Sequence, residues 1–376
     1  SMIVKRLTCS NFRNFKTLNL EPHDGVNVLY GDNAQGKTNL IEAIWLFTGA
    51  RSFRGSKDTE FIRFGEKITS ISLDFFARNL ENTASATLTA DAKQFMLNGI
   101  KMQGFSSFSG QFCAVVFSPD HLVLLKSGPQ HRRKFIDCAI TEIWPRHAAV
   151  LNEYKNLLKQ RNALLKDIPA HSELLDTLPV WDSRLASAGA AIVFARLRYL
   201  SRLKDKASAV YQGIASKTDE KLELDYESPS NSYPTDVSDQ KDALAKIRAS
   251  LEMALKNGLS GDLEAGLTRI GPHRDDIKIS IGGVDSRLYS SQGQQRSAVL
   301  ALKLAEAAVL KETIGEPPVL LLDDVMSELD RNRQNYILNN IGGFQVFITC
   351  CDPSGLEALS GGASFEVKNG VVERRK

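Results

Sequence analysis

The chain has 376 residues, of which 43% are hydrophobic and 24% charged, and its formal net charge is +3. This composition is typical of a globular protein with two domains, or with one large domain that carries an insertion. No apolar run reaches the ~18 residues of a membrane span, so we expect no membrane association. The five cysteines form no CxxC pair, and residues 3–12 resemble a polar strand rather than a signal peptide, so we expect a cytoplasmic protein with reduced thiols.

The positive charge is concentrated in the middle of the chain. Residues 126–216 contain 15 Lys and Arg against 8 Asp and Glu, whereas residues 217–264 are acidic. This asymmetry favours a polyanionic partner, although a charged stretch is more often a solvated face.

The first third of the chain has the alternating pattern of strands. Residues 3–12, 17–22 and 25–31 are expected strands, a helix is expected over 39–47, and further strands are expected over 68–78, 84–90 and 112–118. We therefore expect a β-rich lobe around the loop that follows residue 30.

The middle of the chain is predicted to be helical. Helices are expected over residues 131–144, 146–168, 181–215 and 239–257, with a turn-rich linker over 227–237. A strand is expected over 275–283, a helix over 297–312 and buried strands over 318–325 and 344–351. The fold class is therefore α/β, with an antiparallel helical insertion: residues 1–125 plus 265–376 form one split domain, and residues 126–264 form the inserted arm or lid.

A glycine-rich loop follows the third strand and matches the phosphate-loop pattern GxxxxGK[ST]. Backbone N–H groups converge on phosphate oxygens there only where no Cβ intervenes, and the next helix's N-terminus adds a favourable field. Lys37 is expected to contact the β- and γ-phosphates, and Thr38 to ligate Mg²⁺. The predicted nucleotide-binding residues are Gly31, Asp32, Asn33, Ala34, Gln35, Gly36, Lys37 and Thr38.

Two carboxylates end the apolar strand VLLL. Asp323 is predicted to hold Mg²⁺, directly or through water, and Asp324 to orient or deprotonate the attacking water. Lys37 and Asp324 are thus the predicted catalytic residues. In a compact kinase or GTPase, the second carboxylate usually lies closer in sequence to the phosphate-loop lysine than Asp323 lies to Lys37.

A third polar segment, SSQGQQR at residues 290–296, directly precedes a predicted helix. Its hydroxyls and free N–H groups suit an anion, although a plain N-cap has the same composition.

Together these segments resemble the ABC-type ATPase heads of SMC and related DNA-repair proteins, and more closely the bacterial RecF family of recombination mediators. The blocks that carry the resemblance run from residue 11 to residue 330: NFRNF, GDNAQGKTNLIEAI, SFR, FSPDHL, GPQHRRKFID, GPHRDD, SSQGQQR and LLLDDVMSELD. The resemblance implies an ABC-type ATPase head that binds ATP and Mg²⁺ and forms an ATP-dependent homodimer. Each ATP would lie between one subunit's phosphate loop and Ser291, Gly293 and Gln294 of the other.

The family further implies a weak, DNA-stimulated ATPase that acts as a switch in DNA replication and recombinational gap repair, including the SOS response. Its expected partners are double-stranded and single-stranded DNA at gap junctions, and RecR, which with RecO helps load the RecA recombinase. Ser118 and Cys351 stand where many ABC proteins carry the Q-loop glutamine and the switch histidine. These departures argue against a transporter subunit.

The candidates for DNA contact are cations at helical spacing. Phosphate contacts need only such mobile cations, and no aromatic-rich strand face stands out for base stacking. The candidates are Lys155, Lys159, Arg198, Arg202 and Lys206. The alternatives are a P-loop kinase or other small-molecule NTPase unrelated to DNA, and a structural or transporter-coupled ATPase.

Overall fold

The structure is a computed structural model that describes residues 1–32, 34–50, 54–215, 220–229, 232–356 and 362–376, without the side chains of Ala34 and Gln35. The chain divides into two compact units. The first comprises residues 1–123, 213–216 and 296–376, and the second residues 124–212 and 217–295. Residues 265–295, which the sequence assigns to the split ATPase domain, lie in the second unit.

The first unit contains an antiparallel sheet of six strands in the order β2-β1-β4-β5-β6-β7. Its strands alternate buried and exposed side chains, since one face of the sheet covers a core. They are β1 (Ile3–Phe12), β2 (Phe15–Leu20), β4 (Ile68–Ala77), β5 (Leu80–Thr89), β6 (Lys93–Leu97) and β7 (Ile100–Met102).

The second sheet of this unit has the order β15-β14-β3-β13-β12-β8. Strands β15 and β14 pair with each other in antiparallel fashion, and every other pair of adjacent strands is parallel. Its central strands are continuous apolar runs because both faces are covered. They are β3 (Val26–Tyr30), β8 (Ala114–Phe117), β12 (Val319–Asp323), β13 (Val346–Cys350), β14 (Ala363–Lys368) and β15 (Val371–Arg374).

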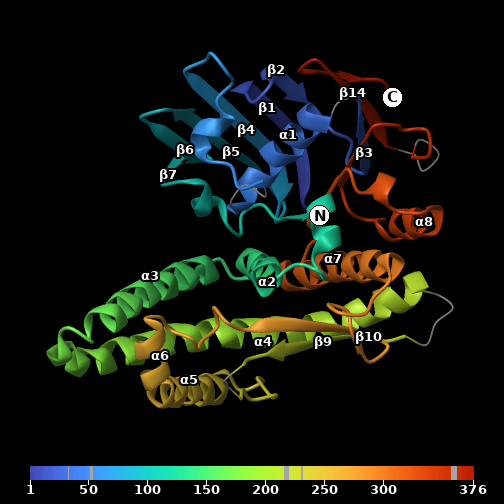
Figure 1. Cartoon of the computed structure of the whole chain (residues 1–376). Coiled ribbons are helices and arrows are strands. Elements are labelled where there is room, and N and C mark those ends of the chain that lie inside the picture. Colours follow the sequence, from blue (N-terminus) through green and yellow to red (C-terminus); the bar gives the residue numbers. More distant parts are fainter. Residues whose placement is uncertain (33, 51–53, 216–219, 230–231, 357–361) are drawn as a thin grey trace. The chain divides into compact units, whose positions relative to one another are not determined.

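Two helices of the first unit follow strands of this second sheet. Helix α1 (Ala34–Trp45) follows β3 (Figure 1). It packs against β12, β13 and β14. Helix α8 (Arg331–Asn340) is capped by Asp330, whose side chain accepts a hydrogen bond from the backbone N–H of Arg333. Helix α1 begins at Ala34, five residues before the start at residue 39 that the sequence predicts. The second half of the phosphate-loop motif therefore lies in the first turns of α1.

The second unit is built on helices with a small sheet. The helices α3, α4 and α5 enclose an apolar core that includes Tyr154, Leu185 and Leu251 (Figure 1). Its helices are α2 (Pro129–Ile143), α3 (Arg146–Asp167), α4 (Leu178–Ala215, whose last residues fall in the first unit), α5 (Gln240–Asn257) and α6 (Leu259–Ala265). None of the helices in the described residues is both long and apolar enough to cross a membrane.

A three-stranded antiparallel sheet explains why residues 265–295 group with this unit. Its order is β11-β10-β9, with β9 (Leu222–Glu227), β10 (Asp276–Ile281) and β11 (Val284–Asp285). Strand β10 pairs with β9 along its whole length, from Asp276 opposite Glu227 to Ile281 opposite Leu222. Strand β9 is not predictable from its sequence, because its alternating acidic residues resemble a solvated segment.

Helix α7 (Gln292–Ile314) starts at the end of the second unit and continues in the first. Its apolar residues, among them Val299, Leu302 and Val309, are buried on nearly every side. It begins five residues before the predicted start, because residues 292–296 of the polar SSQGQQR segment form its first turn.

Candidate nucleotide site

The site is built where three neighbouring parallel strands end. Strands β3, β13 and β12 are adjacent in that order, so the segments after Tyr30, Cys350 and Asp323 emerge at one edge of the sheet. Ligands of open α/β sheets bind outside the carboxyl ends of the strands. The sheet thus brings together the two motifs that lie far apart in sequence.

The phosphate loop is shaped by close backbone approach. A Cβ on Gly31 would lie 2.1 Å from the carbonyl oxygen of Val367 on β14. Since backbone cannot yield as a side chain can, position 31 accepts only glycine. Asp32 is exposed, Gly36 is buried in the first turn of α1, and Asn33 lies outside the described residues, as do the side chains of Ala34 and Gln35.

Lys37 is a buried cation whose partners are neutral. Its side-chain Nζ donates to the carbonyl oxygens of Gly31 at 2.5 Å and Cys350 at 2.9 Å, and it lies 3.6 Å from the Cys351 Sγ. The residue is 3% exposed and makes no ion pair within the described part of the chain. A buried charge without a counter-charge is costly, so this position suits an anionic ligand such as a triphosphate.

Asp323 is a buried carboxylate surrounded by hydroxyl groups. The Thr38 Oγ1 donates to its Oδ1 at 3.1 Å, and the Thr349 Oγ1 donates to the same oxygen at 2.8 Å. Burial raises the pKa of Asp323, the nearby charge of Asp324 adds to that rise, and the two hydroxyls oppose it. A bound cation would restore the charged form, because an opposite charge favours ionisation.

The donors therefore fit Mg²⁺ with most of its ligands supplied from elsewhere. No group of three or more His, Cys, Asp or Glu side chains in the described residues could hold a metal ion. Mg²⁺ is commonly held by one or two protein oxygens plus water and substrate phosphates, as Thr38 and Asp323 would allow.

Asp324 has an unusual backbone conformation, with φ of 52°. Its N–H donates to the Thr349 Oγ1 at 3.0 Å, so one hydroxyl bridges both aspartates. Non-glycine residues at positive φ are uncommon and gather at functional sites when the surroundings hold them there. Asp324 is half-buried and directly follows Asp323 at the end of β12.

Sequence reasoning missed the residues that brace α1. Glu42, fully buried in that helix, accepts from Arg13 at 2.9 Å and from Arg54 at 2.7 Å. It also missed Thr349, whose signal is only a threonine at the end of an apolar strand. Without the strand order, neither Thr349 nor Glu42 can be assigned a partner.

The third motif forms a reciprocal cap at the start of α7. The Gln294 N–H donates to the Ser291 Oγ at 3.1 Å, and the Ser291 N–H donates to the Gln294 Oε1 at 2.8 Å, which is a capping box. Ser291 is exposed and Gly293 and Gln294 are half-buried. These side chains belong to the second unit, whereas the phosphate loop belongs to the first.

The basic candidates lie on two helices of the second unit. Lys155 and Lys159 are exposed on α3, and Arg198 and Arg202 are exposed on α4. Lys206, also on α4, is half-buried. The two helices thus carry all five basic candidates in one unit.

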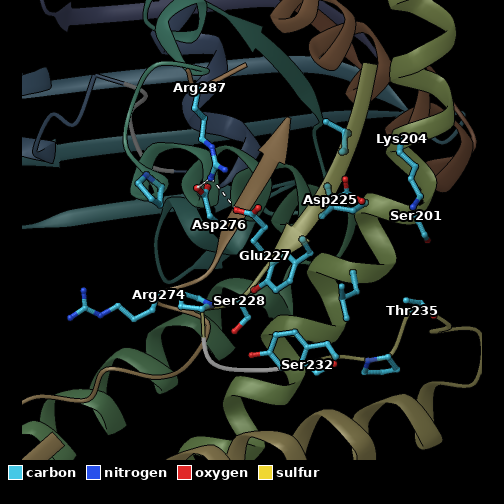
Figure 2. Close-up of a pocket in the computed structure, with 18 residues that line it drawn as sticks. Ser201, Lys204, Asp225, Glu227, Ser228, Ser232, Thr235, Arg274, Asp276 and Arg287 are labelled. Atoms are coloured by element: carbon cyan, nitrogen blue, oxygen red, sulfur yellow. Dashed lines mark hydrogen bonds and ion pairs between the residues drawn. The ribbon is translucent and has the colours of Figure 1, made fainter. Parts of the chain in front are cut away.

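A cavity of about 760 Å³ also lies in the second unit, beside β9 and α4. Figure 2 shows Arg287, Asp276 and Glu227 pointing toward one another in its wall. Arg287 contacts Asp276 at 2.7 Å, Asp285 at 2.5 Å and Glu227 at 3.1 Å. Three carboxylates thus neutralise this cation in the wall of the cavity.

Residues 3–369 match the family model described as RecF/RecN/SMC N terminal domain. The chain is 41% identical to the DNA replication and repair protein RecF of Caldanaerobacter subterraneus subsp. tengcongensis, over 99% of this chain and 100% of that protein. It is 40% identical to the RecF of Ruminiclostridium cellulolyticum, over 93% and 92% of the two chains.

Among solved structures, this chain superimposes with a TM-score of 0.90 on the recombination mediator protein RecF in the RecFOR pathway, solved as RecF-ATPrS. The two chains are 40% identical, and the match covers 99% of this chain and 98% of that one. The Smc head domain of Pyrococcus furiosus, at 14% identity and a TM-score of 0.55, shares the fold, over 100% of this chain and 96% of that one. The fold is thus that of an ABC-type ATPase head with an inserted helical part. The chain belongs to the RecF family of DNA replication and repair proteins.

Proposed function

We propose that this protein is an ATP-switched DNA-binding protein in which two copies pair around bound nucleotide. The observation that carries the proposal is the meeting of Lys37, Thr38 and Asp323 at the ends of adjacent strands. Two RecF structures, at 40% identity to this chain, were solved as RecF-ATPrS and RecF-ATP, which supports the same ligand here.

In this proposal the phosphate loop holds the triphosphate through its backbone N–H groups and Lys37. Bound Mg–ATP supplies negative charge for the pairing of the two copies. It also supplies a bond whose hydrolysis reverses that pairing. Thr38 and Asp323 hold the Mg²⁺, and Asp324 positions the water. Ser291, Gly293 and Gln294 of the second copy cover the open side, where an exposed capping box can exchange its internal bonds for bonds to phosphate.

The paired protein would bind double-stranded and single-stranded DNA at gap junctions. It would then act with RecR and RecO to help load the RecA recombinase. The solved relative acts in the RecFOR pathway, which supports this assignment, and the basic residues of α3 and α4 supply the charge. Slow hydrolysis would release the DNA.

Light scattering tests the switch. Mg²⁺ with ATP should convert monomer to dimer, and Lys37→Ala should abolish the shift because the cation that meets the phosphates is gone. Ser291→Arg should keep ATP binding by each monomer but prevent pairing, whereas Ser291→Thr, which can still cap α7, should pair. An unchanged mass with ATP, or dimers that persist in Ser291→Arg, would contradict the composite site.

A further inference from the structure

A carboxylate from another part of the second unit extends the capping box at the start of α7. The Gln294 Nε2 donates to the Glu220 Oε1 at 2.9 Å, although the two residues lie 74 positions apart in sequence. Glu220 stands just before β9, and both residues belong to the second unit. A side chain outside the SSQGQQR segment therefore contacts one of the residues proposed to cover the nucleotide.

Glu220 is itself held in place by α4 and by the turn between β10 and β11. The buried Tyr211 hydroxyl donates to its second carboxylate oxygen, Oε2, at 3.2 Å, and the Gln212 Nε2 donates to its backbone carbonyl at 2.8 Å. A Cβ on Gly282 would lie 3.5 Å from the Glu220 Cγ, which is ordinary van der Waals contact. The carboxylate is therefore fixed between a buried hydroxyl and the Gln294 amide.

The Gln294 amide lies between two partners with opposite requirements. The Ser291 N–H donates to its Oε1 at 2.8 Å, so this side of the amide must be the oxygen. Glu220 receives its Nε2, and a carboxylate accepts at both oxygens and donates from neither. Only one orientation of the amide satisfies both partners, because reversal would place oxygen against oxygen and N–H against N–H, with the loss of both hydrogen bonds.

This orientation decides what the SSQGQQR segment offers to a phosphate. An amide nitrogen carries two N–H groups, so one remains for a phosphate oxygen while Glu220 holds the other. The reversed amide would offer an oxygen, which repels phosphate. The carboxylate charge of Glu220 would also repel phosphate, so the position and the charge of this side chain have opposite effects on pairing and can be separated by experiment.

We propose that Glu220 is a positioning residue, which holds the Gln294 amide so that its nitrogen is available to the ATP of the other copy. This inference rests on the proposed pairing around ATP and adds to it a residue outside the three motifs. Glu220 acts through Gln294 rather than on the nucleotide itself. The position of its carboxylate, more than its charge, is what pairing requires.

The experiment measures the dimer dissociation constant at saturating ATP and Mg²⁺ by light scattering over a range of protein concentrations. Glu220→Asp keeps the charge but is one methylene shorter, so it cannot reach Tyr211 and Gln294 together. Pairing should weaken by about tenfold for each of the two composite sites, and hence by about 100-fold in the dimer dissociation constant. Glu220→Gln keeps the reach and can still turn its oxygen to Gln294, so it should pair within about threefold of the wild type.

Glu223→Asp is the matched control. Glu223 is an exposed carboxylate on β9, and its shortening should leave pairing unchanged. ATP affinity is measured in a Ser291→Arg background, in which the copies do not pair, and adding Glu220→Asp should leave that affinity unchanged. Gln294→Ala removes the amide through which Glu220 acts, so adding Glu220→Asp to Gln294→Ala should weaken pairing no further.

The outcomes separate the two proposals. If the wild-type protein does not pair with ATP, the proposed function fails and this inference with it. If the wild type pairs but Glu220→Asp pairs equally well, or Glu220→Gln loses pairing as fully as Glu220→Asp, only this inference is overturned. Tighter pairing in Glu220→Gln would show that the carboxylate acts by repulsion, and additive effects with Gln294→Ala would show a general structural role, so either result also overturns it.

Discussion

Asp324 combines a backbone conformation and a chemical position that few residue types satisfy. At φ of 52°, with its N–H held by Thr349, it follows directly after the buried Asp323. Asparagine tolerates the same left-handed conformation, so the side-chain charge can be removed with little change in the backbone. The role of the carboxylate can thus be separated from the role of the turn.

We predict that Asp324→Asn retains the fold, ATP binding and ATP-dependent pairing but hydrolyses ATP about 100-fold more slowly. This factor is the usual contribution of a positioned general base. The measurement is phosphate release at saturating ATP, with nucleotide affinity and dimer mass measured alongside. Hydrolysis at the wild-type rate would remove Asp324 from the catalytic role.

At the scale of elements, a buried ion pair joins α2 to α4. The Arg196 Nη2 lies 2.8 Å from the Asp137 Oδ2, and the same guanidinium donates to the Pro272 carbonyl at 2.8 Å. Burial alone would raise the pKa of Asp137, but the charge and hydrogen bonds of Arg196, with the hydrogen bond to His147, hold this pKa well below its ordinary value. The two helices are therefore joined through a carboxylate that stays ionised.

We predict that Arg196→Met lowers the free energy of unfolding by about 3–5 kcal/mol at pH 7, because Asp137 is left buried without its counter-charge. In the wild type, the pKa of Asp137 is lower in the folded state than in the unfolded state. The ion pair therefore stabilises the folded state above about pH 4, and this stabilisation is lost as the pH falls through the folded-state pKa. The difference in the free energy of unfolding between the wild type and Arg196→Met should therefore decrease in acid.

Urea unfolding followed by circular dichroism between pH 3 and pH 7 measures this difference. The control is Arg198→Met, an exposed arginine on the same helix, for which the expected change is below about 0.5 kcal/mol. Equal effects of the two substitutions would show that the buried pair does not stabilise the unit.

At the scale of the whole molecule, the phosphate-loop and carboxylate motifs lie in one unit, and the basic helical candidates lie in the other. The motifs for phosphate and Mg²⁺ lie in the first unit, whereas Lys155, Lys159, Arg198, Arg202 and Lys206 lie in the second. Substitutions on α4 can therefore test the proposed DNA contact without changing Lys37, Thr38 or Asp323.

We predict that Arg198→Ala with Arg202→Ala weakens DNA binding and flattens its salt dependence while ATP affinity is unchanged. If each arginine meets one phosphate, the slope of log K against log salt should fall by about 1.8 in magnitude. Titrations at several salt concentrations, with ATP, ADP and no nucleotide, measure the slope. An unaltered slope would exclude this part of α4 from the DNA contact.

Much of the fold and part of the site could be predicted from the sequence because local strings determine them. The segment GDNAQGKT follows an apolar strand and opens a helix, and the apolar run before Asp323 ends in two carboxylates. Such motifs need only a few consecutive residues and the elements beside them. Their boundaries were less accurate: α1 and α7 both begin five residues before their predicted starts, since polar first turns resemble loops.

Only the tertiary structure decided which distant residues meet. The insertion of β13 between β3 and β12 places Thr349 beside Asp323, and the packing of α1 joins Glu42 to Arg13 and Arg54. The pairing of β10 with β9 determines that residues 265–295 group with the helical unit. The physical reason is that strand order and register depend on hydrogen bonds and packing between segments tens to hundreds of residues apart, which no local pattern records.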